Sequence, residues 1–207
     1  MSATRCLLAT SFALILLLAP PASAQTPHVP CPTLTAQSSA QLMVSGPYVG
    51  YYKYTITMTW DVGVHDPSHV DILVGLADCA CVCDPRLFAF ASPAGTSTGL
   101  NASGACVVPF GGMYLCKGDP SIKDMTTGPA VKFVPDESAC STDETGSGTF
   151  VFYSPLPPGP NDVLPDAVAI KHGTDVCYGA IVGVLPMCDC SVPASATTWG
   201  KLKSYYH

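Results

Sequence analysis

The sequence predicts an all-β protein, a disulfide-stapled antiparallel β-sandwich of about seven to nine short strands. Its 20 prolines and 18 glycines interrupt the chain too often for long helices, and they suit short strands joined by turns. Several segments alternate apolar and polar residues with a period of two, whereas helical periodicity is nowhere sustained. The third observation is the count of 11 cysteines, which in an exported chain indicates disulfides.

The first residues have the features of a secretory signal peptide. A short basic start precedes an apolar run, and Ala22-Ser23-Ala24 gives an A-x-A cleavage pattern. The run is shorter than the about 20 apolar residues that a spanning helix needs. We therefore expect a secreted, extracellular protein with no membrane span. The expected organisation is a signal peptide at residues 1–24, a lead-in with an edge strand or loop at 25–50, one β-sandwich domain at 51–190 and a C-terminal tail at 191–207.

The clearest strand is predicted at residues 51–62. Large apolar residues alternate there with lysine and threonine, which places them on one face of an extended chain. These residues are Tyr52, Tyr54, Ile56, Met58 and Trp60. We expect this face in the core and the threonine face in solvent.

Shorter apolar segments predict the remaining strands, and glycine and proline predict the connections. The strands are expected at residues 70–76, 87–91, 130–134, 148–154, 166–172 and 176–185. The last two are joined by a hairpin at Gly173-Thr174-Asp175. Turns or loops are expected at residues 65–68, 96–104, 109–120 and 146–148.

Ten cysteines follow the predicted cleavage site, an even number that predicts up to five disulfides. They are Cys31, Cys79, Cys81, Cys83, Cys106, Cys116, Cys140, Cys177, Cys188 and Cys190. The alternate cysteines of residues 79–83 are the alternative candidates for a thiolate metal site, although structural zinc sites usually space their ligands C-x2–4-C. Because a bond within a C-x-C pair is strained, we expect at least one disulfide between residues 79–83 and Cys188 or Cys190.

His65 and His69, with Asp71 beside them, are the other candidates for a metal site. Imidazole and carboxylate groups together bind zinc or calcium, or act as a base with its orienting group. However, a spacing of four residues brings two side chains together only on a helix, and Pro67 lies between these histidines. We therefore favour a structural role, in which His69 bonds to a backbone carbonyl at the start of a strand. His172 is similarly expected to be a hairpin residue.

Charge and motifs argue against several classes of function. Fifteen acidic and nine basic residues give a net charge of −6, whereas nucleic-acid binding requires a basic surface. The sequence has no G-x-S-x-G motif and no phosphate-binding glycine loop. Asp136 and Glu137 are adjacent, so on a strand they would point to opposite faces and could not act as a catalytic pair. We expect a protein that is not an enzyme and has no cofactor.

Four short motifs occur in an order typical of a known family. They are Ser68-His69-Val70-Asp71, Val131-Lys132-Phe133, Ala169-Ile170-Lys171-His172-Gly173 and Val176-Cys177-Tyr178-Gly179. Together they resemble a family of secreted bacterial β-sandwich modules, immunoglobulin-like in fold, of extracellular and surface proteins. The resemblance covers about residues 51–190 and implies fold and export, since members are generally of unassigned function. The cysteines of residues 79–83 are denser than that pattern.

These observations predict an exported, non-enzymatic structural or binding module of the cell exterior, which displays loops on a disulfide-stabilised β scaffold. The expected partner is a protein or glycan at the cell surface, or a second copy added at an exposed edge strand. The alternative is a metal-binding protein that uses the clustered cysteines, or His65 and His69. A secreted hydrolase is the third hypothesis.

Overall fold

The structure is a computed structural model that describes residues 33–63, 65–74, 93–122, 129–160 and 166–186. Several predictions lie outside these residues: the signal peptide, the strand at 87–91, the tail at 191–207, and the six cysteines Cys31, Cys79, Cys81, Cys83, Cys188 and Cys190. Within the described ranges the regular structure is entirely β, so the predicted all-β class is confirmed. A helix long and apolar enough to cross a membrane does not occur in these ranges.

Twelve strands make up the described part of the chain. They are β1 (Thr33–Leu42), β2 (Tyr52–Asp61), β3 (Pro67–Leu73), β4 (Ala94–Asn101), β5 (Gly104–Leu115), β6 (Ala130–Pro135), β7 (Ser141–Thr142), β8 (Thr145–Ser154), β9 (Pro158–Pro160), β10 (Val168–His172), β11 (Asp175–Gly179) and β12 (Ile181–Pro186).

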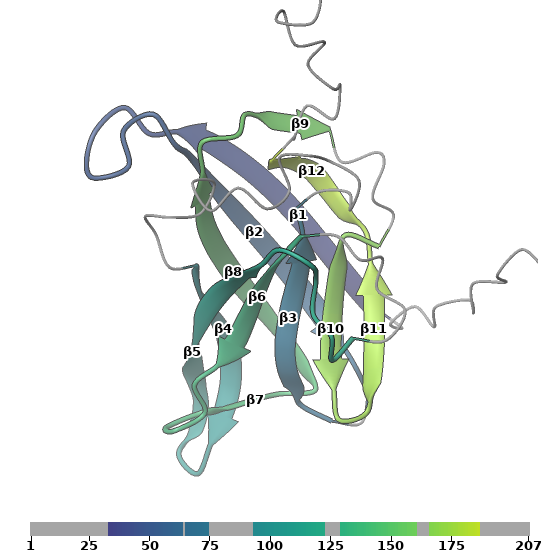
Figure 1. The fold of residues 1–207 in the computed structure, drawn as a ribbon. Helices are drawn as coiled ribbons and strands as arrows, with labels where there is room; N and C mark the ends of the chain where they lie inside the picture. Colours follow the sequence, from purple (N-terminus) through teal and green to yellow (C-terminus); the bar gives the residue numbers. More distant parts are fainter. Residues whose placement is uncertain (1–32, 64, 75–92, 123–128, 161–165, 187–207) are drawn as a thin grey trace, which may run out of the picture.

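The strands form one continuous sheet in the order β11-β10-β3-β6-β5-β4-β8-β2-β1-β12-β9, with the short β7 paired to β4. The sheet curls over so that its two halves face each other (Figure 1). Phe133 on β6 and Phe150 on β8 contact each other across the interior, with ring centroids 5.0 Å apart, although two strands separate them in the sheet. The architecture is therefore sandwich-like.

Three details of the predicted sandwich were wrong. The two halves belong to one sheet, and the described residues form twelve strands instead of seven to nine. The sheet is also not purely antiparallel, because β1 and β12 run parallel. As a result β1 lies between β2 and β12 and is not an edge strand.

The alternation on β2 has the expected orientation. Tyr54, Ile56, Met58 and Trp60 are at most 3% exposed, whereas the intervening threonines face outward. The polar tips of the buried aromatics are satisfied, since the Tyr54 hydroxyl donates to the Leu156 carbonyl at 2.8 Å and Trp60 Nε1 donates to the Asp143 carbonyl at 3.1 Å. The period-two pattern of residues 51–62 thus places this strand against the core.

The glycine-rich segments predicted as loops or turns at residues 96–104, 109–120 and 146–148 are largely strand, in β4, β5 and β8. Several of the glycines lie where neighbouring atoms leave no room for a side chain. A Cβ on Gly146 would lie 2.9 Å from Cζ2 of Trp60, and one on Gly148 would lie 2.9 Å from Cε2 of Phe150. A Cβ on Gly99 would clash with the Ser141 carbonyl oxygen. Glycine therefore marks crowded strand positions as well as turns in this chain.

Two connections also differ from the expectation. Pro67 and Ser68 already belong to β3, so the predicted turn at residues 65–68 ends earlier. The predicted strand at 176–185 is two strands, β11 and β12, which lie in different parts of the sheet. The hairpin between β10 and β11 forms as predicted, with His172 opposite Asp175 and a positive φ of 56° at Gly173.

Disulfides hold the chain at several described positions. Cys106 on β5 is bonded to Cys140, which precedes β7, with an S–S distance of 2.00 Å and a Cα–Cα distance of 6.0 Å. Cys116 and Cys177 are also disulfide-bonded. The Cys106–Cys140 bond fixes the segment that leads into β7 against the β4–β5 hairpin.

Candidate functional site

Hydroxyl side chains cover the outer face of four adjacent strands, β1, β2, β8 and β4. One row crosses the sheet through the paired positions Thr35, Thr59 and Ser147 and continues to Thr98. A second row crosses through the paired positions Gln37, Thr57, Thr149 and Thr96. Because neighbouring strands lie about 4.8 Å apart and alternate residues on one strand about 6.7 Å apart, the side chains form a regular array.

This face is hollowed into a groove of about 550 Å³. Its lining residues are Thr35, Gln37, Thr57, Met58, Thr59, Thr96, Ser97, Thr98, Val107, Ser147, Gly148 and Thr149. Among these described residues none carries a charge, and hydroxyl groups predominate. The groove is thus uncharged, with hydroxyl and apolar groups mixed in its lining.

The hydroxyl groups of the groove already interact with one another and with the backbone. The Oγ1 atoms of Thr35 and Thr59 are 2.7 Å apart, and Thr98 Oγ1 accepts a hydrogen bond from the Ser147 N–H at 3.0 Å. A hydroxyl offers one donor and two acceptor positions, so each of these groups retains capacity for a ligand. The threonine methyl groups and the exposed Val107 add apolar contact area.

Only part of this groove could be predicted from the sequence. The solvent-facing threonines of β2 follow from its alternation, and the structure places Thr57 and Thr59 as expected. Thr96 and Thr98 were missed because their segment was assigned to a loop. The signal was present as threonine at alternate positions of β4, a pattern that a strand displays on one face.

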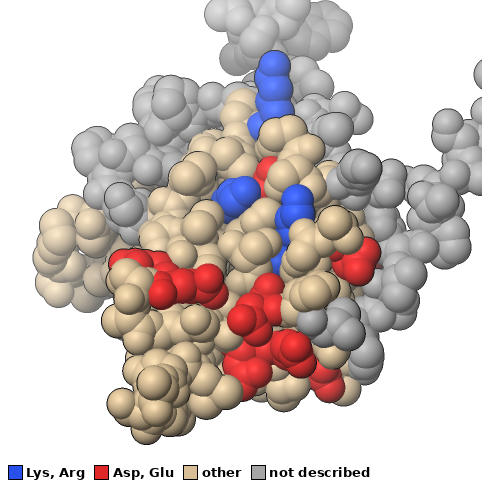
Figure 2. Space-filling view, turned by 90° about the horizontal axis from the view of Figure 1, so that it is seen from below, with Lys and Arg blue, Asp and Glu red and all other residues tan. Residues whose placement is uncertain are grey.

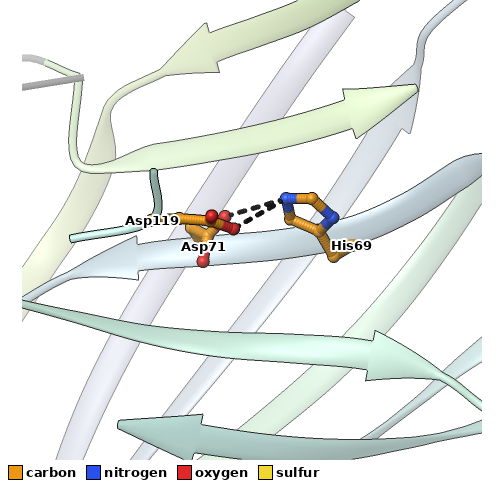
Figure 3. A group of neighbouring side chains, drawn as sticks. All are labelled: His69, Asp71 and Asp119. Carbon is orange, nitrogen blue, oxygen red and sulfur yellow. Dashed lines mark ion pairs between the residues drawn. The ribbon is translucent and has the colours of Figure 1, made fainter. Parts of the chain in front are cut away.

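A second candidate site is a buried cluster of His69, Asp71 and Asp119 (Figure 3). His69 and Asp71 are two residues apart on β3, so they share one face of that strand. Asp119 comes from the turn after β5 and points toward them. His69 Nε2 lies 3.3 Å from Asp71 Oδ2 and 3.1 Å from Asp119 Oδ2.

The cluster lies beneath residues 119–122, a segment that covers the outer face of β3, β6 and β10. Ile122 from this segment packs with Ala169 and Tyr178 into a small second hydrophobic cluster. Asp119 organises the turn, since its Oδ1 accepts from the Ser121 N–H at 2.8 Å and its backbone carbonyl accepts from the Ile122 N–H at 3.1 Å. The carboxylate is thereby held over β3.

Burial and charge shift the ionisation of all three groups. Burial, with the positive charge of Lys132, lowers the pKa of His69 to about 4. Burial, with the negative charge of Asp119, raises the pKa of Asp71 to about 7. Burial also acts to raise the pKa of Asp119, but hydrogen bonds from Lys132 and Ser121 outweigh it and hold that pKa at about 2.

Asp71 differs from Asp119 in its partners. Lys132 Nζ donates to Asp119 Oδ2 at 2.6 Å, whereas both carboxylate oxygens of Asp71 are buried without a hydrogen-bond partner in the described part of the chain. The side chain of Asp71 is 0% exposed. A buried carboxylate in this position needs a proton or a cation to balance it.

The structure brings together only part of the metal site expected from the sequence. His69 and Asp71 are neighbours, but His65 is not in this cluster; its ring lies against Gly173 at the β10–β11 hairpin. His69 Nε2 faces the two carboxylates and lies 3.4 Å from the Ser121 hydroxyl, whereas the sequence predicted a bond from His69 to a backbone carbonyl. Sequence reasoning missed Asp119, because residues 109–120 were assigned to a loop. No motif or spacing pointed to this aspartate.

The remaining candidate residues have structural roles. Glu137 Oε1 accepts hydrogen bonds from both the backbone N–H and the hydroxyl of Thr142, at 3.1 Å and 2.7 Å, so it fixes β7. His172 is buried beside the hairpin, as predicted, with Nε2 3.4 Å from Cys177 Sγ. Burial lowers the pKa of His172.

Acidic side chains gather at one end of the molecule, as Figure 2 shows from below. Burial raises the pKa of Asp66 there, and the charges of Glu137, Asp143 and Glu144 add to the effect. The negative charge of these carboxylates repels anionic partners from this end. The acidic patch therefore argues against anionic ligands at this end of the molecule. It does not by itself indicate a binding site.

Comparison with known proteins gives no family for this chain. No family model matches the sequence, and no curated protein matches it. Among solved structures, a family IIIA cellulose-binding domain from Clostridium cellulolyticum is similar at a TM-score of 0.42 and 9% sequence identity, over 74% of this chain and 99% of that chain. A similarity this low carries no argument for the function of this protein.

Proposed function

We propose that this protein is an exported, non-enzymatic binding module of the cell exterior, and that its hydroxyl-lined groove holds a neutral glycan chain. The observation that carries the proposal is the groove on β1, β2, β8 and β4, which is lined by hydroxyl groups and, among its described residues, has no charge. Export is supported by the signal-like sequence of residues 1–24 and by the disulfides.

The chemistry of the groove selects its ligand class. A charged polymer would have to give up its hydration without gaining an ion pair in a lining of this kind, which is unfavourable. A neutral glycan presents hydroxyl groups that can exchange donors and acceptors with Thr57, Thr149 and their neighbours. Its C–H groups can contact the threonine methyls and Val107.

The dimensions of the groove favour an extended chain. The hydroxyl rows cross four strands, a span of about 14 Å at the usual strand spacing. The array lies on paired strands of a disulfide-bonded sheet, so little conformational entropy is lost when a ligand binds. A rigid and shallow surface of this type suits reversible binding along a polymer.

Self-association by strand addition is the weaker alternative. The β9 edge of the sheet contains Pro158 and Pro160, which have no backbone N–H to donate to an added strand. At the other end of the order, β11 lies against β1, where a Cβ on Gly179 would contact Leu34. Both features protect the edges against addition of a second copy.

A binding screen with matched variants tests the proposal. Affinity electrophoresis in gels that contain neutral or anionic polysaccharides should show retardation by at least one neutral polymer and none by the anionic ones. The double variant Thr57→Val with Thr149→Val removes two groove hydroxyls while it keeps β-branched side chains on exposed strand positions. We expect it to lose most of the retardation.

The control is a double variant of exposed strand threonines outside the groove, Thr33→Val with Thr145→Val. It should retain full binding, because neither side chain lines the groove. Equal loss in both double variants, or retardation by anionic polymers only, would contradict the proposal.

A further inference from the structure

Three potential ligand atoms converge at the His69–Asp71–Asp119 cluster. His69 Nε2, one oxygen of Asp71 and one oxygen of Asp119 all lie within 4.8 Å of one another. Figure 3 shows the imidazole nitrogen pointing at both carboxyl groups. At such distances an imidazole nitrogen either donates its own proton to the carboxylates or shares a cation with them.

The separations match those around a bound transition metal. Bonds of about 2.0–2.1 Å to nitrogen and oxygen place two tetrahedral ligand atoms about 3.3 Å apart, and two ligands at right angles about 2.9 Å apart. The distances from His69 Nε2 to the Asp119 and Asp71 oxygens are 3.1 Å and 3.3 Å, within this range. Two of the three ligand separations thus already fit a bound cation, and the third is below 4.8 Å.

Asp71 provides an independent second observation. Its side chain is completely buried, it points into the cluster, and neither oxygen has a hydrogen-bond partner among the described residues. The nearby Lys132 ammonium bonds to Asp119 instead. The fold therefore leaves one buried carboxylate without a hydrogen-bond partner among the described residues at the point where three ligand atoms meet.

The surroundings of Asp119 resemble the supporting shell of a metal ligand. Its Oδ1 accepts from the Ser121 N–H, and its Oδ2 accepts from Lys132 Nζ. A carboxylate oxygen has two lone pairs, so Oδ2 can bind a cation while Lys132 remains in place. Ligating carboxylates are usually oriented by such hydrogen bonds.

We propose that His69, Asp71 and Asp119 bind one divalent first-row transition cation, with Zn²⁺ the best fit to one imidazole and two carboxylates. Three protein ligands leave a further coordination position for water at this buried site. Because Asp119 belongs to the segment over β3 and the other two ligands belong to β3 itself, the cation fastens that segment to the sheet. This site is separate from the groove, so the two proposals stand independently.

Titration of the chelator-treated, fully oxidised protein with Zn²⁺ in a calorimeter tests the site directly. We expect one equivalent to bind, with micromolar affinity or better, and the midpoint of thermal unfolding to rise with the Zn²⁺ concentration. Asp71→Asn and Asp119→Asn each remove one ligand at nearly constant volume. Each should weaken binding by at least about 100-fold, more than the 10–100-fold typical of a second-shell change.

His65→Gln is the matched control, because His65 was a ligand of the site expected from sequence but lies at the β10–β11 hairpin. It should leave the affinity for Zn²⁺ unchanged. Co²⁺ substitution provides a readout of ligand type, since nitrogen and oxygen ligands give weak visible bands without sulfur-to-metal charge transfer.

Three results would overturn the assignment. The first is a wild-type protein that binds no Zn²⁺ at millimolar concentration. The second is wild-type affinity in folded Asp71→Asn or Asp119→Asn protein. The third is a Co²⁺ spectrum with thiolate charge-transfer bands, which would place the cation on cysteines. The first and third results use the unmodified chain, so they do not depend on whether a variant folds.

Discussion

Removing the Cys106–Cys140 disulfide should destabilise the fold mainly by freeing the unfolded chain. The bonded residues are 34 positions apart. For a closed loop of this length the chain-entropy relation gives a contribution of about 4 kcal/mol at 25 °C. Cys116 lies within the loop and is itself disulfide-bonded, so the unfolded variant remains partly cross-linked. We therefore expect the double variant Cys106→Ala with Cys140→Ala to lose about 2–4 kcal/mol.

Urea unfolding at equilibrium measures both the loss and its origin. A less constrained unfolded chain exposes more surface, so the dependence of the free energy of unfolding on urea should become steeper as the midpoint falls. Ser103→Ala, an exposed change in the same β4–β5 hairpin, is the control and should stay within about 0.5 kcal/mol. A loss below about 1 kcal/mol, with an unchanged slope, would refute the reasoning.

Three further predictions test the packing and the charges. Phe150→Ala removes a ring that contacts two other phenylalanines at centroid distances of 5.0 and 5.2 Å, and urea unfolding should show a loss of about 3–5 kcal/mol. Gly183→Ala places a Cβ against the backbone oxygen of Ser38 at a φ of +127°, so a loss above about 2 kcal/mol is expected, whereas Gly111→Ala, which has open space, should be near neutral. Because the pKa of Asp66 is raised above 3.8 in the fold, its ionisation opposes folding as pH rises through that raised value. Asp66→Asn should therefore raise the thermal unfolding midpoint at pH 7 and leave it unchanged below pH 3.8, and the opposite order would contradict this explanation.

The all-β class could be predicted because its signals are local. The alternation in residues 51–62 defines both faces of β2 from the sequence alone, and the hairpin at Gly173 follows from turn chemistry. Glycine was the source of the errors at residues 96–104, 109–120 and 146–148. Gly146 and Gly148 lack side chains because Trp60 and Phe150 occupy the space, and a single sequence does not distinguish this reason from a turn.

The long-range features of the two sites were not accessible to sequence reasoning. Asp119 reaches His69 and Asp71 only because a turn folds back over the outer face of β3. The groove likewise depends on the order β1-β2-β8-β4, which aligns threonines from distant segments. Side-chain periodicity predicts which residues share a strand face, but strand order sets which faces adjoin.

The central claim is that the hydroxyl-lined groove is the binding site for a neutral glycan. Nuclear magnetic resonance of labelled protein, titrated with a short oligomer of the neutral polysaccharide that binds best, tests it most directly. The account predicts that the largest amide shifts fall on residues of the groove, including Thr57, Thr96 and Thr149, with little change at His69. Shifts confined to the loops, or concentrated on the opposite half of the sheet around β3 and β10, would contradict it.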